Sequence, residues 1–141
     1  MFPAPYETFI SLFNAQRFWD AHEVLEGPWR RSCSRFYKGL IIYASAFVHL
    51  QRGNPVGIGK QMRKVLHYLP PFEPCYMGLD VSAITAHAET CCRAVAGREG
   101  LRGDVEALMQ LIPIPRLSLE VGYVRGDEPE LQSEKEGTDD G

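Results

Sequence analysis

The sequence lacks the long hydrophobic run, leader segment and phosphate-binding loop that would assign it to several common classes. Its longest apolar stretch, residues 39–50, is shorter than the roughly 20 residues that a bilayer-spanning helix needs. The N-terminus shows no basic stretch followed by an apolar run, so we expect no signal peptide and a cytoplasmic location. Gly53, Gly57 and Gly59 match neither the dinucleotide-binding pattern nor the P-loop. Neither a membrane protein nor a nucleotide-binding enzyme of these types is expected.

Cysteine is also sparse, with four residues in the chain. They form no CxxC pair, and the adjacent Cys91 and Cys92 do not have the spacing of zinc ligands. In a cytosolic protein the thiols are expected to be reduced. We therefore interpret the cysteines as small hydrophobic residues of the interior, at Cys33, Cys75, Cys91 and Cys92.

Acidic side chains are concentrated at the C-terminal end. The formal net charge is −3, yet residues 127–141 alone hold seven acidic side chains and one lysine. The rest of the chain carries 14 basic and 11 acidic side chains, an excess too small to predict a nucleic-acid partner. This distribution predicts one folded domain over residues 1–122, followed by a disordered acidic tail over residues 123–141.

Hydrophobic residues recur at helical spacing through most of the chain. They predict an all-α, single-domain, up-and-down bundle of five or six helices. The expected helices cover about residues 4–14, 17–30, 35–52, 55–69, 81–96 and 102–112. Gly27-Pro28 should kink or end the second helix early, because proline removes a helical hydrogen bond. The third helix is apolar around most of its circumference, which is typical of a central, buried helix.

Two blocks of residues resemble a known family. The first is Phe13-Asn14, the run from Phe18 to Glu26, and Trp29-Arg30; the second is Gly39-Leu40-Ile41, His49-Leu50 and Arg52-Gly53-Asn54. Their order and spacing over residues 6–69 are similar to those of the small bacterial and archaeal "domain of unknown function 309" family. The resemblance implies a short helical bundle. The family has no established activity and has been labelled a predicted metal-dependent hydrolase; it often has glutamine where this chain has Ile42.

The first block contains an HExxE pattern that could supply metal ligands. His22 and Glu26 are four residues apart, so their side chains point the same way from one helix. An imidazole and a carboxylate make half of a metal site, and we expect His49, on a polar stripe of the third helix, to complete it. One bound divalent metal would then activate a water for hydrolysis. Glu23 would act as the base, and Arg30 would orient an anionic substrate.

The same residues also suit a purely structural role. His22 at the edge of an apolar face could be a hydrogen-bonded core residue, and Glu26 with Arg30 has the spacing of an ordinary helical ion pair. The competing hypothesis is therefore a non-enzymatic interaction or scaffold domain. Its partner would be an unknown small molecule or protein, and the sequence is compatible with a homo-oligomer. We expect it to bind neither a membrane nor a nucleic acid. The sequence alone does not decide whether the chain is an enzyme.

Overall fold

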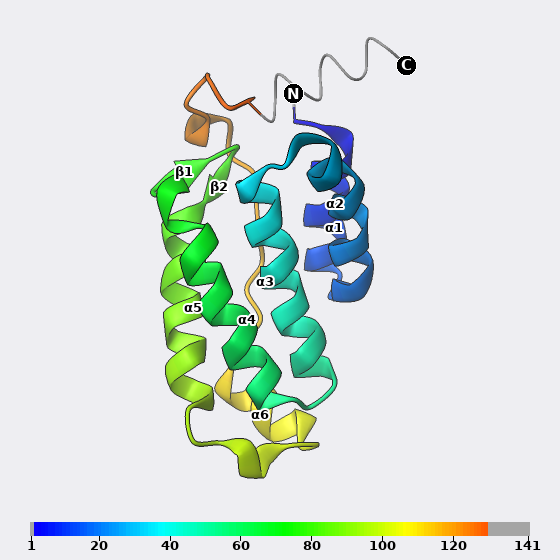
Figure 1. Ribbon diagram of the computed structural model, residues 1–141, viewed down its shortest axis with the longest axis vertical. Coiled ribbons are helices and arrows are strands. Elements are labelled where there is room, and N and C mark those ends of the chain that lie inside the picture. The colour runs from blue at the N-terminus through cyan, green and yellow to red at the C-terminus, as the bar shows by residue number, and fades with distance from the viewer. Residues whose placement is uncertain (1, 130–141) are drawn as a thin grey trace.

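The computed structural model describes residues 2–129, in which six α-helices form a bundle (Figure 1). Their bounds are α1 Ala4–Asn14, α2 Phe18–Ser32, α3 Arg35–Gln51, α4 Pro55–Tyr68, α5 Val81–Val95 and α6 Val105–Leu111. The remaining elements are short: η1 Pro70–Phe72, β1 Cys75–Tyr76, β2 Leu79–Asp80, η2 Glu99–Leu101 and η3 Val121–Tyr123. The antiparallel strands β1 and β2 form a two-residue ladder. The predicted all-α bundle is confirmed, and each of the first five helices packs mainly against its neighbours in the chain.

Side-chain caps explain where four of the helices begin. An N-cap oxygen accepts a hydrogen bond from a backbone N–H in the first turn, which would otherwise have no partner. The capping residues are Ser34 for α3, Asn54 for α4, Asp80 for α5 and Asp104 for α6. Proline at the first position of α4 adds a preset backbone angle. The sequence therefore sets these boundaries locally.

Of the predicted kink or early end of α2 at Gly27-Pro28, the early end is wrong, because the helix continues to Ser32 with Pro28 inside it. The Pro28 ring is buried on the same face as Ala21 and Leu25, and this burial offsets the hydrogen bond that proline cannot donate. The helix ends instead at Cys33, whose φ of 54° is left-handed and whose N–H donates to the Trp29 carbonyl. Packing has overridden the local signal.

The core is built around α3, which lies between α2 and α4 (Figure 1). Twelve of its 17 residues are buried, which confirms that it is the central helix. Phe13, Phe18, Tyr43 and Phe47 pack their rings together with centroids 5.0–5.6 Å apart, joining α1 and α2 to α3. Edge-to-face and offset ring pairs add to the free energy of burying these residues. Within residues 2–129, no helix has the length and hydropathy to cross a bilayer.

The cysteines are less uniform than expected. Cys91 is buried, but Cys33 is exposed, and Cys75 and Cys92 are partly buried. Cys33 is exposed because it occupies the left-handed position that ends α2. The interpretation of the cysteines as interior residues therefore holds fully for Cys91 alone.

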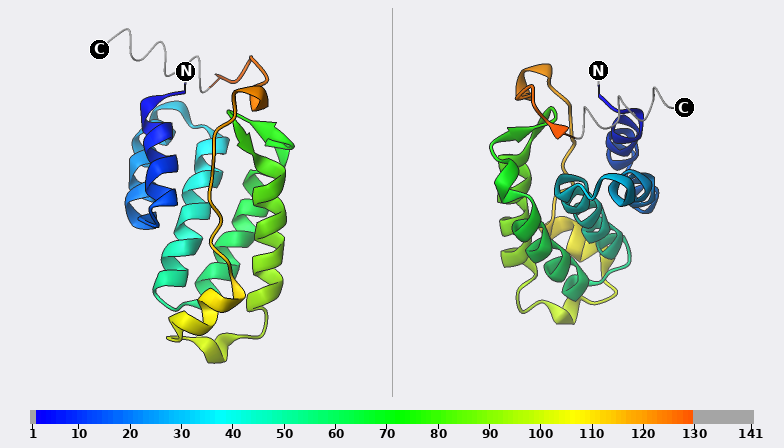
Figure 2. Two further views of the ribbon diagram at one scale, coloured as in Figure 1. Left: turned by 180° about the vertical axis from the view of Figure 1, so that it is seen from behind. Right: turned by 45° about the horizontal axis from the view of Figure 1, so that its top comes forward.

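A strap, defined here as residues 113–120, runs back along the bundle after α6 (Figure 2). The side-chain amide of Asn14 binds the strap through both backbone groups of Leu117. Its Nδ2 donates to the Leu117 carbonyl at 2.7 Å, and its Oδ1 accepts from the Leu117 N–H at 2.8 Å. Beyond the strap, Glu128 is 1% exposed and accepts hydrogen bonds from the N–H groups of Met77, Arg125 and Gly126. Residues 123–129, expected to begin the disordered tail, are thus attached to the bundle. Residues 130–141 of that tail lie outside the described residues.

Candidate functional site

The structure brings together three of the five predicted site residues along α2. His22 Nε2 lies 3.2 Å from Glu26 Oε1, and Arg30 Nη2 lies 3.3 Å from Glu26 Oε2. The side chains of His22 and Glu26 are 19% and 33% exposed, whereas that of Arg30 is 70% exposed. The i, i+4 spacing thus produces a chain of three polar groups in which the carboxylate is shared. Glu23 is exposed on the same helix and is not among the residues that line the pocket at His22 described below.

The two ring nitrogens of His22 have different surroundings. Its Nδ1 is buried and has no hydrogen-bond partner within residues 2–129. A proton on Nδ1 would therefore be a buried donor without an acceptor, which is costly. Nε2, which lies 3.2 Å from a carboxylate oxygen of Glu26, is the ring nitrogen better placed to carry a hydrogen. Trp19 stacks on the imidazole with ring centroids 5.2 Å apart, so the ring is held by a carboxylate and an indole.

His49 has different neighbours. Its Nδ1 accepts a hydrogen bond from Asn54 Nδ2 at 3.2 Å, while Asn54 Oδ1 caps α4 by accepting from the Gly57 N–H. The ring also packs so closely on Gly57 that a methyl group there would overlap it. Burial, together with the positive charge of Arg52, lowers the pKa of His49. The imidazole therefore joins the end of α3 to the start of α4.

The metal site predicted from the sequence is not assembled. Among residues 2–129, no three His, Cys, Asp or Glu side chains are grouped so that they could hold a metal ion. Glu26 is already engaged by His22 and Arg30, and His49 is engaged by Asn54. One imidazole and one carboxylate are fewer ligands than zinc sites use, so these residues do not fit a divalent metal.

A pocket of about 470 Å³ adjoins His22 between α2, α3 and α4. It is lined by His22, Lys38, Ile41, Ile42, Ser45, Gln61, Lys64, His67 and Tyr68. The α3 residues lie on the polar stripe that the sequence indicated, or beside it. The α4 wall of the pocket was not predicted from the sequence. The signal that could have found it is the complete lack of acidic residues on α4.

Aromatic rings hold two of the cations near this pocket. Lys38 Nζ lies 4.2 Å from the centre of the Trp29 ring, and the Arg35 guanidinium carbon lies 4.6 Å from that of Tyr68. Such cation–π contacts orient a charged group without neutralising it. Lys38 is partly buried, while Lys64 on the opposite wall is exposed. Lys38 is therefore held against an indole ring, whereas Lys64 is open to solvent.

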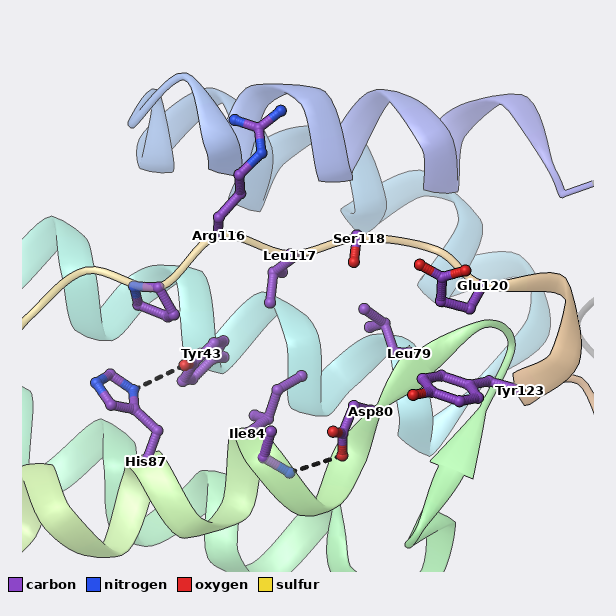
Figure 3. Close-up of a pocket in the computed structure, with 12 residues that line it drawn as sticks. Tyr43, Leu79, Asp80, Ile84, His87, Arg116, Leu117, Ser118, Glu120 and Tyr123 are labelled. Carbon is purple, nitrogen blue, oxygen red and sulfur yellow. Dashed lines mark hydrogen bonds between the residues drawn. The ribbon is translucent and has the colours of Figure 1, made fainter.

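A second polar group, unforeseen from the sequence, lies beneath the strap (Figure 3). Tyr43 and His87 Nδ1 are 2.8 Å apart, and His87 Nε2 lies 3.0 Å from the Pro113 carbonyl oxygen. Because a carbonyl only accepts, Nε2 carries the hydrogen and Nδ1 accepts from the Tyr43 hydroxyl. Burial raises the pKa of Tyr43 and lowers that of His87, so both are neutral near pH 7. The pair connects α3, α5 and the strap, beside a smaller pocket of about 280 Å³.

Comparison with known proteins gives one match. The family model described as "Domain of unknown function (DUF309)" matches residues 6–60. No curated protein matches the chain, and no solved structure does. The matched segment contains the His22–Glu26 pair and the α3 wall of the larger pocket.

Proposed function

We propose from the geometry that the protein binds a small polar molecule between α2, α3 and α4, since the description of the family model that matches residues 6–60 records no function. The observation that carries the proposal is the pocket of about 470 Å³ at His22. Ligand pockets in proteins typically measure about 300–1,000 Å³ and combine apolar walls with a few placed polar groups. Here Ile41 and Ile42 supply apolar surface, and Ser45 and Gln61 supply neutral polar groups.

The state of His22 favours recognition over proton transfer. A histidine acting as a general base needs a free nitrogen within reach of the reacting group. In this pocket Nε2 is engaged by Glu26 and Nδ1 is buried, so neither nitrogen is free to take a proton from a ligand. The Glu26–His22 contact is then a means of fixing the pocket wall. We therefore propose a binding protein and not a hydrolase.

In this proposal the protein binds its ligand without a metal ion. Metal analysis tests this claim separately from ligand binding. Tag-free protein should contain far less than one equivalent of zinc, manganese or iron by mass spectrometry. Near-stoichiometric metal that disappears in His22→Ala, but not in Glu23→Ala, would contradict the proposal and restore the metal site expected from the sequence. Glu23 is the matched control because it is an exposed acid on the same helix.

A second candidate function is an interaction domain, and the exposure of Trp19 favours it. The Trp19 residue is 50% exposed, although the indole stacks on His22 and lies 5.6 Å from the guanidinium carbon of Arg52. Exposed tryptophans next to arginine are common at the centres of protein interfaces. In this alternative, copies of the chain associate through Trp19. Sedimentation analysis would then show an oligomer that dissociates in Trp19→Ala.

The binding proposal is tested by screening the full chain against a library of small polar metabolites. Thermal shift identifies candidates, and two-dimensional amide NMR locates them. We expect at least one saturable ligand whose largest shift changes fall on residues lining the pocket. Ser45→Leu should abolish this binding, because the larger side chain occupies the pocket while leucine retains the helical preference of α3.

Ser11→Leu, on the exposed face of α1, is the matched control and should bind as wild type does. Gln61→Trp fills the pocket from α4 and serves if Ser45→Leu does not fold. Ligands whose binding is unaffected by both pocket-filling variants would contradict the proposed site. The complete absence of pocket ligands would contradict the proposed function.

A further inference from the structure

The two helices that form most of the pocket have charges of one sign. Arg35 and Lys38 lie on α3, and Lys60, Arg63 and Lys64 lie on α4, while neither helix contains an aspartate or glutamate. This is unusual in a chain whose formal net charge is −3. The positive potential is thus a local feature of these helices and does not reflect the composition of the protein. A concave site lined by one sign of charge concentrates ions of the opposite sign.

Within the pocket this charge is not cancelled. Lys38 and Lys64 line it from α3 and α4, and none of the described residues that line it is an aspartate or glutamate. Outside the lining, the Glu26 carboxylate lies 3.2 Å from His22 Nε2 and accepts a hydrogen bond from Arg30. Its negative charge is therefore balanced outside the pocket. Two lysine side chains thus line the space that a ligand would fill.

We propose that the ligand is a small phosphate monoester. This inference rests on the proposed function and names its ligand class. A phosphate monoester carries about −1.5 to −2 charges at pH 7, which matches two lysine ammonium groups. Lysine binds phosphate as a point charge, and the lining of this pocket contains two lysines and no arginine. The pocket thus offers the ester one lysine from α3 and one from α4.

The remaining lining suits the organic part of such an ester. Gln61 adds a neutral hydrogen-bond donor beside Lys64 on α4, and His67 follows Lys64 on the same wall. Ile41 and Tyr68 offer apolar and aromatic surface next to these polar groups. Phosphate contacts would position the ligand, and the apolar surface would cover its carbon skeleton. A pocket of about 470 Å³ holds a molecule of this size but not a folded macromolecule.

The test uses three probes that share a six-membered aromatic ring and differ in charge. Phenyl phosphate, benzoate and benzyl alcohol are titrated into the full chain and followed by amide NMR. Phenyl phosphate should bind in a saturable way and perturb Ser45, Gln61 and Lys64. Benzoate should bind at least about tenfold more weakly because it has one charge, and benzyl alcohol more weakly still. Raising the salt concentration should weaken phenyl phosphate binding.

Two lysines on α4 give a matched pair of variants. Lys64→Gln removes an ammonium from the pocket, and its dissociation constant for phenyl phosphate should rise by about tenfold, as for the loss of one charge-assisted hydrogen bond. Lys60→Gln removes the same charge from the same helix outside the pocket and should change binding less than about twofold. Equal losses in the two variants would mean that a diffuse basic surface attracts the anion, and the proposed site would be wrong.

The remaining outcomes separate the ligand class from the proposed function. If benzoate or benzyl alcohol binds the pocket as tightly as phenyl phosphate, the phosphate class is overturned while a binding function stands. If phenyl phosphate perturbs no pocket residue but the metabolite screen yields a neutral or cationic pocket ligand, the class is again overturned alone. If neither experiment finds a pocket ligand, both proposals fail.

Discussion

Replacing Asn14 with alanine should release the strap without unfolding the bundle. The Asn14 amide forms two short hydrogen bonds with the backbone of Leu117, which is 103 residues away in sequence. Alanine removes both bonds, and Leu117 is only 6% exposed, so its N–H and carbonyl would lose their partners in a largely covered position. The strap would then depend on Pro113 with His87 and on Gly78 with Glu120.

The size of the effect follows from these bonds. A protein hydrogen bond contributes about 0.5–1.5 kcal/mol net, and a buried group left without its partner costs about 1–3 kcal/mol. Loss of the two bonds to this one covered backbone position should therefore destabilise the attached strap by about 2–4 kcal/mol. Alanine has a higher helix propensity than asparagine, and at the last position of α1 this offsets at most about 0.7 kcal/mol of that loss. Because domains are stable by about 5–15 kcal/mol, the variant should remain folded at 25 °C.

Hydrogen exchange monitored by NMR is the decisive assay, since it reports local opening. A loss of 2–3 kcal/mol should speed exchange of the Leu117 amide by about 30- to 150-fold, provided that it exchanges through strap opening. Asn14→Asp is the matched control. It keeps an acceptor for the Leu117 N–H but cannot donate to the carbonyl, so its exchange should fall between wild type and alanine. Unchanged Leu117 exchange in Asn14→Ala would refute the strap argument.

Three further changes test other parts of the structure. Burial lowers the pKa values of His49 and His87, so the unfolded state binds more protons than the folded state. The contribution of the two histidines to the free energy of unfolding should therefore be complete above about pH 6.5 and be lost as the pH falls. Urea unfolding between pH 7.5 and 5 measures it, and a midpoint that does not change with pH would contradict it. Gly57→Ala should lower the free energy of unfolding by about 1–3 kcal/mol, because the added methyl group overlaps His49. Gly100→Ala is the control and should be nearly neutral, because its methyl group meets open space. Equal melting temperatures of the two variants would disprove the contact. Phe13→Ala should cost about 3–5 kcal/mol in the same assay by opening a cavity among packed rings, and a loss below 1 kcal/mol would contradict that packing.

The helices could be predicted from sequence because their signals are local. Hydrophobic spacing located all six, and the caps of α4 and α5 by Asn54 and Asp80 are formed by residues directly beside those helices. The strap could not be predicted in the same way. Its attachment depends on an amide at the end of α1 meeting a backbone group 103 residues later, and no periodic pattern records such a contact. Pro28 failed as a signal for a related reason, since its burial in the core outweighs its local preference.

In the candidate site too, contacts within one helix could be predicted from the sequence, and contacts between helices could not. The contact of His22 with Glu26 follows from a spacing of four residues on one helix, and it was predictable. His49 lies on the polar stripe of α3, but a stripe shows only which residues share a face and not which neighbouring helix that face meets. The ring of His49 meets Asn54 and Gly57 at the start of α4. The expected third ligand is thereby part of a helix connection.

The extent of the family match bears on how the ligand would be recognised. The match over residues 6–60 contains Lys38 and Ser45, but ends just before Gln61 and Lys64, which begin the α4 wall of the pocket. The segment that matches the family model therefore does not contain the second lysine on which the phosphate proposal depends. If Lys64→Gln abolishes selectivity for phenyl phosphate over benzoate while Lys38→Met weakens both probes alike, ligand class is set by the α4 wall. The matched segment would then provide the cavity and His22, and the residues that follow it would determine which anion the cavity accepts.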